Sequence, residues 1–192
     1  MVEKVAKRLS EKTRQSGHLV LTGFFGTAPL NPMLTDTGHS DDAYMLMTQT
    51  KCPSWLYPVT QGATSIWERW DSFTLEKGFG GHNNMNSFNH YSLGAVLEWF
   101  YMYVLGIMRN EDVPGYRHFL VRPYVNPAYK YVRGHFTSPY GIIRAQWQME
   151  EDGKYMYSIE IPAGATATVS LPGIEQTEVG SGRHEYTFYI NK

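Results

Sequence analysis

The sequence has 192 residues, of which 42% are hydrophobic and 18% charged, and its formal net charge is -1. This composition is typical of a globular chain that forms one domain or two small ones. Without a strong net charge or a dense basic patch, the chain is not expected to bind nucleic acid. Residues 1–14 lack the apolar segment of a secretion signal, and no apolar run is long enough to cross a membrane. We therefore expect no membrane contact, and the protein could be cytoplasmic, or the chain could begin inside a longer periplasmic or secreted one.

The first part of the sequence predicts helices. Apolar residues of segment 2–9 lie at helical spacing among Lys and Glu, which predicts an amphipathic helix that ends before Gly17. A short helix is expected to begin at Pro29, because proline is tolerated in a first helical turn. Ser40 is expected to cap the next helix, which ends before Pro53.

Residues 91–107 are apolar nearly all round, with Glu98 as the single charge, which predicts a helix enclosed by other elements. Beyond Pro114 the pattern changes to short runs rich in Tyr, Val, Ile, Phe and Thr. Strict alternation in residues 155–161 is typical of strands. We therefore predict an α+β fold with two domains: a helical domain at residues 1–112 and an antiparallel β-sandwich of seven or eight strands at residues 113–192.

Two long segments without helical pattern, residues 52–79 and 80–89, are rich in Trp, Tyr, Asn and His. The first contains the run ATSIWERWD at residues 63–71, in which Glu68 lies among tryptophans. A carboxylate beside an indole suits a site that cleaves sugars, since a glycosidase needs an acid or base next to a stacking surface. In the alternative interpretation, Glu68 and Arg69 are ordinary surface charges between two anchoring tryptophans.

A second candidate is the run NNMNSFNH at residues 83–90, directly before the predicted helix. Asn89 and His90 offer neutral donors and acceptors that suit sugar hydroxyls. The same residues could instead cap the helix and bond to the loop backbone.

Other classes of site lack their patterns. None of the seven histidines lies at metal-ligand spacing such as HxxxH, and Cys52 is the single cysteine. The glycine-rich runs do not have the order of a nucleotide-binding loop. We therefore predict no metal and no cofactor.

Four segments resemble bacterial α-L-rhamnosidases of glycoside hydrolase family 78 in their order and spacing. They read TGFFGT at residues 22–27, PSWLY at 53–57, GATSIWERWD at 62–71 and MNSFNHY at 85–91. Downstream, the runs PGY, RP, SPYG and EVGSG resemble the C-terminal β-domain of that family. The resemblance covers almost the whole chain from about residue 17.

The resemblance implies an inverting glycoside hydrolase that releases terminal α-L-rhamnose from glycosides or polysaccharides. This chain would hold the last helical hairpins of a six-hairpin α/α-barrel. By motif match Glu68 corresponds to the general base and His90 to a residue that contacts rhamnose, with Asn89 beside it. Three tryptophans would shape or line the pocket: Trp55, Trp67 and Trp70.

The general acid of the family lies upstream, in barrel hairpins that this sequence does not contain, so the missing part of the barrel is an expected partner. Two alternatives stay open. One is a non-catalytic carbohydrate-binding or interaction protein derived from such an enzyme. The other is an inverting α/α-barrel glycosidase that is specific for another sugar.

Overall fold

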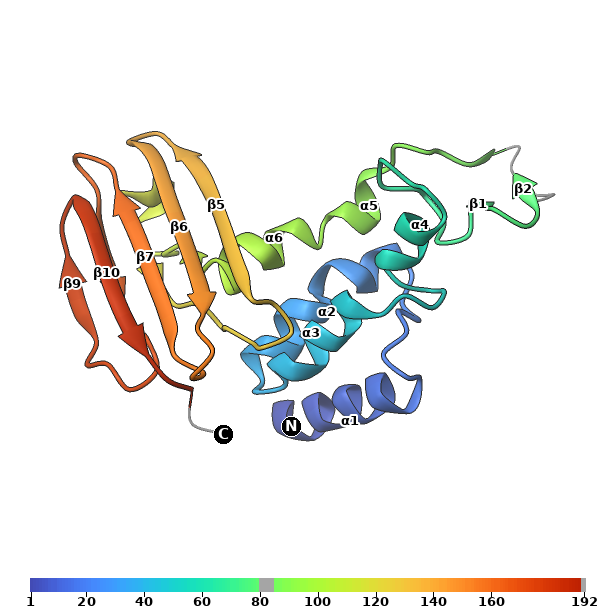
Figure 1. Ribbon diagram of the computed structural model, residues 1–192, viewed down its shortest axis with the longest axis horizontal. Helices are drawn as coiled ribbons and strands as arrows, with labels where there is room; N and C mark the ends of the chain where they lie inside the picture. The colour runs from blue at the N-terminus through green and yellow to red at the C-terminus, as the bar shows by residue number, and fades with distance from the viewer. Residues whose placement is uncertain (80–84, 191–192) are drawn as a thin grey trace. The chain divides into compact units, whose positions relative to one another are not determined.

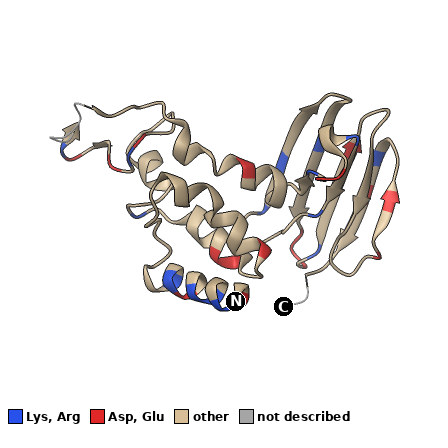
Figure 2. Cartoon of the chain, turned by 180° about the vertical axis from the view of Figure 1, so that it is seen from behind, with Lys and Arg blue, Asp and Glu red and all other residues tan. Residues whose placement is uncertain are grey.

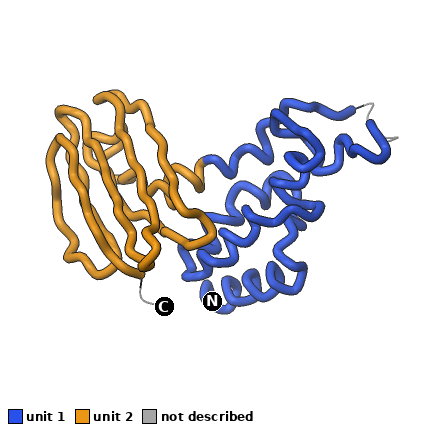
Figure 3. Tube along the Cα trace, viewed as in Figure 1, with its two compact units in different colours: residues 1–97 blue, residues 98–192 orange. Residues whose placement is uncertain are grey.

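The computed structural model describes residues 1–79 and 85–190. The chain divides into two compact units, Met1–Leu97 and Glu98–Lys192 (Figure 3). The first is helical and the second consists mainly of strands, which confirms the predicted α+β fold class. No helix within the described residues is both long enough and apolar enough to span a lipid bilayer.

Helices and a small hairpin build the first unit, which also includes the short helix α5 described below (Figure 1). The helices are α1 (Val2–Gln15), α2 (Phe24–Asp36), α3 (Ser40–Thr48) and α4 (Leu56–Thr60), and the hairpin pairs β1 (Phe73–Thr74) with β2 (Gly78–Phe79). The amphipathic helix is confirmed, since α1 ends two residues before Gly17, which has a φ of 72° that suits glycine.

Two predicted helix starts are wrong. The second helix begins at Phe24, five residues before Pro29, because Gly23 accepts the first helical bonds: the N–H groups of Gly26 and Thr27 both lie 3.0 Å from its carbonyl oxygen. Ser40 is the first residue of α3, and His39 holds the cap position, so Ser40 is not the cap that the sequence predicts.

A buried carboxylate connects α1 to α3. Asp42, in the first turn of α3, is 3% exposed. Its oxygens accept bonds from Ser10 Oγ at 2.6 Å and from Arg14 Nε at 2.8 Å, and His18 Nε2 lies 3.1 Å away. Figure 2 shows further Lys and Arg positions along α1, the helix whose Arg14 pairs with Asp42.

The continuous helix predicted for residues 91–107 is wrong. The segment forms three short pieces and a strand: α5 (Tyr91–Gly94), α6 (Leu97–Trp99), the π-helix η2 (Phe100–Val104) and β3 (Ile107–Met108). Helix geometry ends before Gly106, which has a φ of 80°, and a Cβ atom on it would lie 2.5 Å from the backbone nitrogen of Pro123. The side chains of residues 91–107 are not all enclosed, since Tyr91 is 85% exposed while Trp99 is fully buried.

Two four-stranded sheets build most of the second unit, and the 3-10 turn η3 (Pro114–Tyr116) follows β3, the first of their strands. One sheet has the order β10-β7-β6-β5 and is antiparallel; the other has the order β3-β4-β8-β9, in which the β4–β8 pair is parallel. Their bounds are β4 (His118–Val121), β5 (Tyr131–Ser138), β6 (Gly141–Met149), β7 (Tyr155–Ile161), β8 (Thr166–Val169), β9 (Thr177–Val179) and β10 (Gly182–Phe188).

The core of the second unit follows the alternation that the sequence predicts. On β7 every second side chain is buried, from Tyr155 to Ile161. Trp147 Nε1 donates to the carbonyl of Val104 at 2.8 Å, and the hydroxyl of Tyr157 donates to that of Leu105 at 2.9 Å. These bonds satisfy the polar ends of two buried aromatic side chains and fix the chain after η2 against the sheet.

Candidate functional site

The two candidate runs bond to each other within the first unit. The N–H of His90 donates to the carbonyl of Ile66, and the N–H of Glu68 donates to that of Ser87, both at 2.8 Å. Between these two bonds one residue of the first segment, Trp67, faces two of the other, Phe88 and Asn89, which is the count of a β-bulge. Because a bulge changes the direction of nearby side chains, this pairing determines how Glu68 and His90 are oriented relative to each other.

The Glu68 side chain is half-buried and bonded to the facing segment. Its Oε2 accepts the N–H of Ser87 at 2.8 Å. Across the described ranges Oε1 accepts no hydrogen bond, and the carboxylate forms no ion pair. The neighbouring Arg69 donates to the carbonyl of Met85 instead, at 3.4 Å. The arrangement therefore differs from a surface pair between Glu68 and Arg69.

Two aromatic rings lie nearly parallel to the ring of His90. The ring of Phe24 stacks on it at 5.1 Å between centroids, and that of Tyr91 at 5.7 Å. Its Nδ1 accepts the N–H of Ser92 at 3.3 Å and so caps α5, as the capping interpretation of this run expects. With Nδ1 as acceptor, the neutral ring carries its hydrogen on Nε2, which has no bonding partner in the part of the chain that the structure describes.

The polar neighbours of His90 differ in their positions. Asn89 is exposed, and its N–H donates to Ser87 Oγ at 3.2 Å. Asn86 Oδ1 accepts from the buried Ser72 hydroxyl at 3.0 Å, so it holds the loop. Asn83 and Asn84 of the same run lie outside the described residues.

The three tryptophans pack around this pairing in two ways. Trp55 and Trp67 are each only 6% exposed. Trp55 donates to the carbonyl of Leu93 at 2.8 Å and meets Trp70 edge to face at 5.4 Å, while Trp67 meets Phe88 at 5.4 Å. Trp70 is half-buried. Trp55 and Trp67 thus support the backbone of the site, and Trp70 is the most exposed of the three.

Phe24 was not in either candidate run of the sequence, and Ser87 lay in the second run without an assigned role. Phe24 opens α2 and brings the TGFFGT run onto His90, and the backbone of Ser87 orients Glu68. Both lie inside runs that resemble the family, and this was the one available signal. A ring stack between residues 66 positions apart leaves no periodic pattern in a sequence.

Comparison with known proteins assigns both units. Residues 1–104 match the family described as the bacterial alpha-L-rhamnosidase 6 hairpin glycosidase domain. Residues 106–185 match the bacterial alpha-L-rhamnosidase C-terminal domain. The chain is thus part of a helical-hairpin glycosidase domain followed by a β-domain. It belongs to the bacterial α-L-rhamnosidase family, which confirms the resemblance found in the sequence.

Similar proteins carry the same name. An α-L-rhamnosidase from Streptomyces avermitilis is 39% identical over 185 residues, a match that covers 86% of this chain and 18% of that protein. One from Formosa agariphila is 33% identical, covering 88% of this chain and 18% of its own length. The chain therefore spans less than a fifth of these curated relatives.

Solved structures agree in fold. The native α-L-rhamnosidase of Aspergillus terreus superposes with a TM-score of 0.89 at 37% identity, covering 96% of this chain and 21% of that one. The Streptomyces avermitilis α-L-rhamnosidase, solved in complex with L-rhamnose, gives 0.88 at 36% identity, covering 97% of this chain and 20% of that one.

Proposed function

We propose that the complete protein is a glycoside hydrolase that releases terminal α-L-rhamnose from glycosides or polysaccharides with inversion, and that Glu68 is its general base. In such a reaction one carboxylate takes a proton from water as the water attacks the anomeric carbon. A carboxylic acid on the opposite side protonates the leaving oxygen. The bond between the Ser87 N–H and Glu68 Oε2 is the observation that carries this proposal.

That bond gives Glu68 the two properties that a base needs. Fixing Oε2 restricts the rotation of the carboxylate, so the position of Oε1 is determined before water arrives. Because Oε1 accepts no bond from the described residues, it can accept a hydrogen bond from water and then its proton.

His90 and Trp70 are proposed to contact the sugar, with Asn89 as an exposed neighbour. The Nε2–H of His90 is a donor that a rhamnose hydroxyl can accept, and stacking by Phe24 and Tyr91 holds it in place. The half-buried ring of Trp70 can pack against the sugar, whereas Trp55 and Trp67 are buried and hold the loops in position.

The general acid is proposed to lie outside these 192 residues, in the part of the longer relatives that this chain does not match. Under this proposal the chain holds one half of an acid and base pair. The rhamnoside and the remaining barrel hairpins are then its partners in the complete protein.

The proposal is tested by assaying nitrophenyl α-L-rhamnoside with two proteins: the 192-residue chain and the complete product of its gene. The complete product is expected to hydrolyse it. The chain alone should give no turnover above background, since loss of general acid catalysis alone removes about 10²–10⁴-fold of the rate. Matched nitrophenyl α-L-fucoside and β-D-glucoside serve as controls for sugar specificity.

Each other outcome contradicts a part of the proposal. Turnover by the chain alone, with contaminating enzyme excluded, would show that the acid is not elsewhere. Preference for another glycoside would assign the site to a different sugar. Absence of turnover of every glycoside by a folded complete product would favour the non-catalytic carbohydrate-binding alternative.

A further inference from the structure

The outward face of the sheet β10-β7-β6-β5 carries polar side chains in register. Because alternate residues of a strand share one face, the strand pairing places them in rungs that cross all four strands. The first rung consists of Arg183, Glu160, Arg144 and His135. The second consists of Glu185, Ser158, Gln146 and Arg133.

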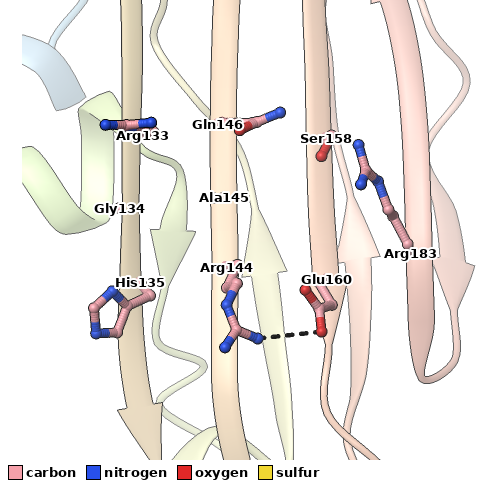
Figure 4. A pocket seen from close by; sticks show the side chains of 9 residues that line it. All are labelled: Arg133, Gly134, His135, Arg144, Ala145, Gln146, Ser158, Glu160 and Arg183. Atoms are coloured by element: carbon pink, nitrogen blue, oxygen red, sulfur yellow. Dashed lines mark hydrogen bonds and ion pairs between the residues drawn. The ribbon is translucent and has the colours of Figure 1, made fainter.

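This face has an open depression over the two rungs, and Figure 4 shows the residues that line it. A cavity of about 360 Å³ lies over the first two rungs. A second of about 370 Å³ continues toward a third rung, which consists of Thr187, Met156, Gln148 and Tyr131. The two share Arg133, Gln146, Ser158 and Arg183 in their linings. The side chain of Ser158 is shorter than those of its neighbours Glu185 and Gln146, so the backbone of the sheet is less covered there.

Positive charge exceeds negative charge on these rungs. Three guanidinium groups meet two carboxylates: Arg144 bonds to Glu160 at 3.2 Å and Arg183 to Glu185 at 2.7 Å. Arg133 forms no ion pair with any described residue. Exposed pairs of this kind contribute only about 0–1 kcal/mol, so a ligand carboxylate can replace the glutamates. A guanidinium offers two parallel N–H donors, the geometry that a carboxylate accepts.

The remaining side chains suit hydroxyl groups and a sugar ring. Gln146 and Ser158 point toward the space between their strands in Figure 4, and neither side chain bonds to a described residue. Amide and hydroxyl groups both donate and accept, as sugar hydroxyls require. On the third rung, the aromatic ring of Tyr131 is 71% exposed at the edge of the second cavity, where a pyranose can stack.

We propose that this face binds an acidic oligosaccharide, with a uronate carboxylate on Arg133 and neighbouring hydroxyls on Gln146 and Ser158. The recognition of a carboxylate follows from the excess of guanidinium groups over carboxylates on the two rungs. The choice of a sugar as its carrier rests in addition on the proposed function. The face would hold an acidic polysaccharide while another part of the protein acts on it.

The test measures binding by the 192-residue chain with calorimetry and amide NMR. The probe is a trisaccharide of α-1,4-linked galacturonic acid, compared with the same trisaccharide whose carboxylates are reduced to alcohols. The acidic probe is expected to bind and to shift amide signals of β5, β6, β7 and β10. Arg133→Gln should weaken binding by about fivefold or more, the loss of one charge-assisted bond. Glu160→Gln should strengthen it, because Arg144 loses its competing carboxylate.

The matched control is Arg117→Gln, an exposed arginine of the same unit that lies before β4 and away from this sheet; it should leave affinity unchanged. Equal binding of both trisaccharides, or no effect of Arg133→Gln, would overturn the proposal. So would binding of inorganic phosphate alone, or weaker binding by Glu160→Gln. Since no rhamnoside is used, failure here is distinguishable from failure of the proposed hydrolase activity.

Discussion

Replacing Glu68 by glutamine in the complete gene product should lower kcat for an aryl α-L-rhamnoside by roughly 10²–10⁴-fold, with little change in KM. The amide oxygen can still accept the Ser87 N–H, so the paired segments keep their geometry. An amide cannot take a proton from water at neutral pH, so the interaction that disappears is one made in the transition state. Substrate binding, which does not need that proton transfer, should persist.

The control for Glu68→Gln is Glu76→Gln, the same change at an exposed glutamate of the β1–β2 hairpin region. Steady-state rates over a range of rhamnoside concentrations separate kcat from KM for both variants. Glu76→Gln should keep the rate of the unmodified protein. An unchanged kcat in Glu68→Gln would return Glu68 to the alternative of an ordinary surface charge.

Replacing Asp42 by asparagine should destabilise the first unit by about 1.5–3 kcal/mol, the range for hydrogen bonds to a charged group. Three donors converge on this carboxylate, from Ser10, Arg14 and His18, and an amide offers one oxygen and adds two donors of its own. Arg14 is 61% exposed, so water replaces part of what it loses, and the larger cost of a fully buried ion pair does not apply.

The effect of Asp42→Asn should depend on pH. Burial disfavours the charged carboxylate, but bonds from Arg14, Ser10 and His18 outweigh it and hold the pKa of Asp42 below its ordinary 3.8. A depressed pKa in the folded state contributes stability above pH 3.8, and this contribution is lost as pH falls through the folded value. The stability difference between the two proteins should be largest near neutral pH and shrink below about pH 3.8.

Urea unfolding followed by amide signals of α1 and α3 measures this difference for the first unit alone. Asp41→Asn is the matched control, since Asp41 is the exposed neighbour in the same helical turn. It should cost less than Asp42→Asn, because the Asp41 side chain is exposed and exposed charges contribute only about 0–1 kcal/mol. Equal stability of Asp42→Asn and the unmodified chain at pH 7 would contradict the structural role of Asp42.

Local patterns of the sequence predicted the parts of the fold that local forces determine. Alternation placed β7 at its observed bounds, because its burial repeats with the period of a strand. Helical spacing placed α1, but the predicted apolar Val2 and Val5 are exposed, and the residues that α1 buries are Ala6, Ser10 and Thr13. The short strand β9 has three residues and no buried side chain, so no period could reveal it. The prediction for 91–107 failed for another reason: an apolar composition does not reveal that the segment breaks into α5, α6 and the π-helix η2 before β3 begins.

The candidate site was predictable as a set of residue types but not as an arrangement. The runs around Glu68 and His90 could be singled out from composition and resemblance. Their direct pairing, through Ile66 and Ser87, depends on backbone bonds between segments about 20 positions apart. The split of the tryptophans into buried supports and the half-buried Trp70 likewise follows from tertiary packing, which residue type alone does not encode.

We propose that the paired segments around Glu68 and His90 form the rhamnoside site. A crystal structure of the Glu68→Gln form of the complete gene product, with an intact aryl α-L-rhamnoside bound, would locate the sugar. We expect the sugar within hydrogen-bond distance of His90 Nε2. We also expect a water between the side chain at position 68 and the anomeric carbon, on the side opposite the leaving group. A rhamnoside bound away from both residues, or a side chain at position 68 directed away from the anomeric carbon, would contradict this proposal.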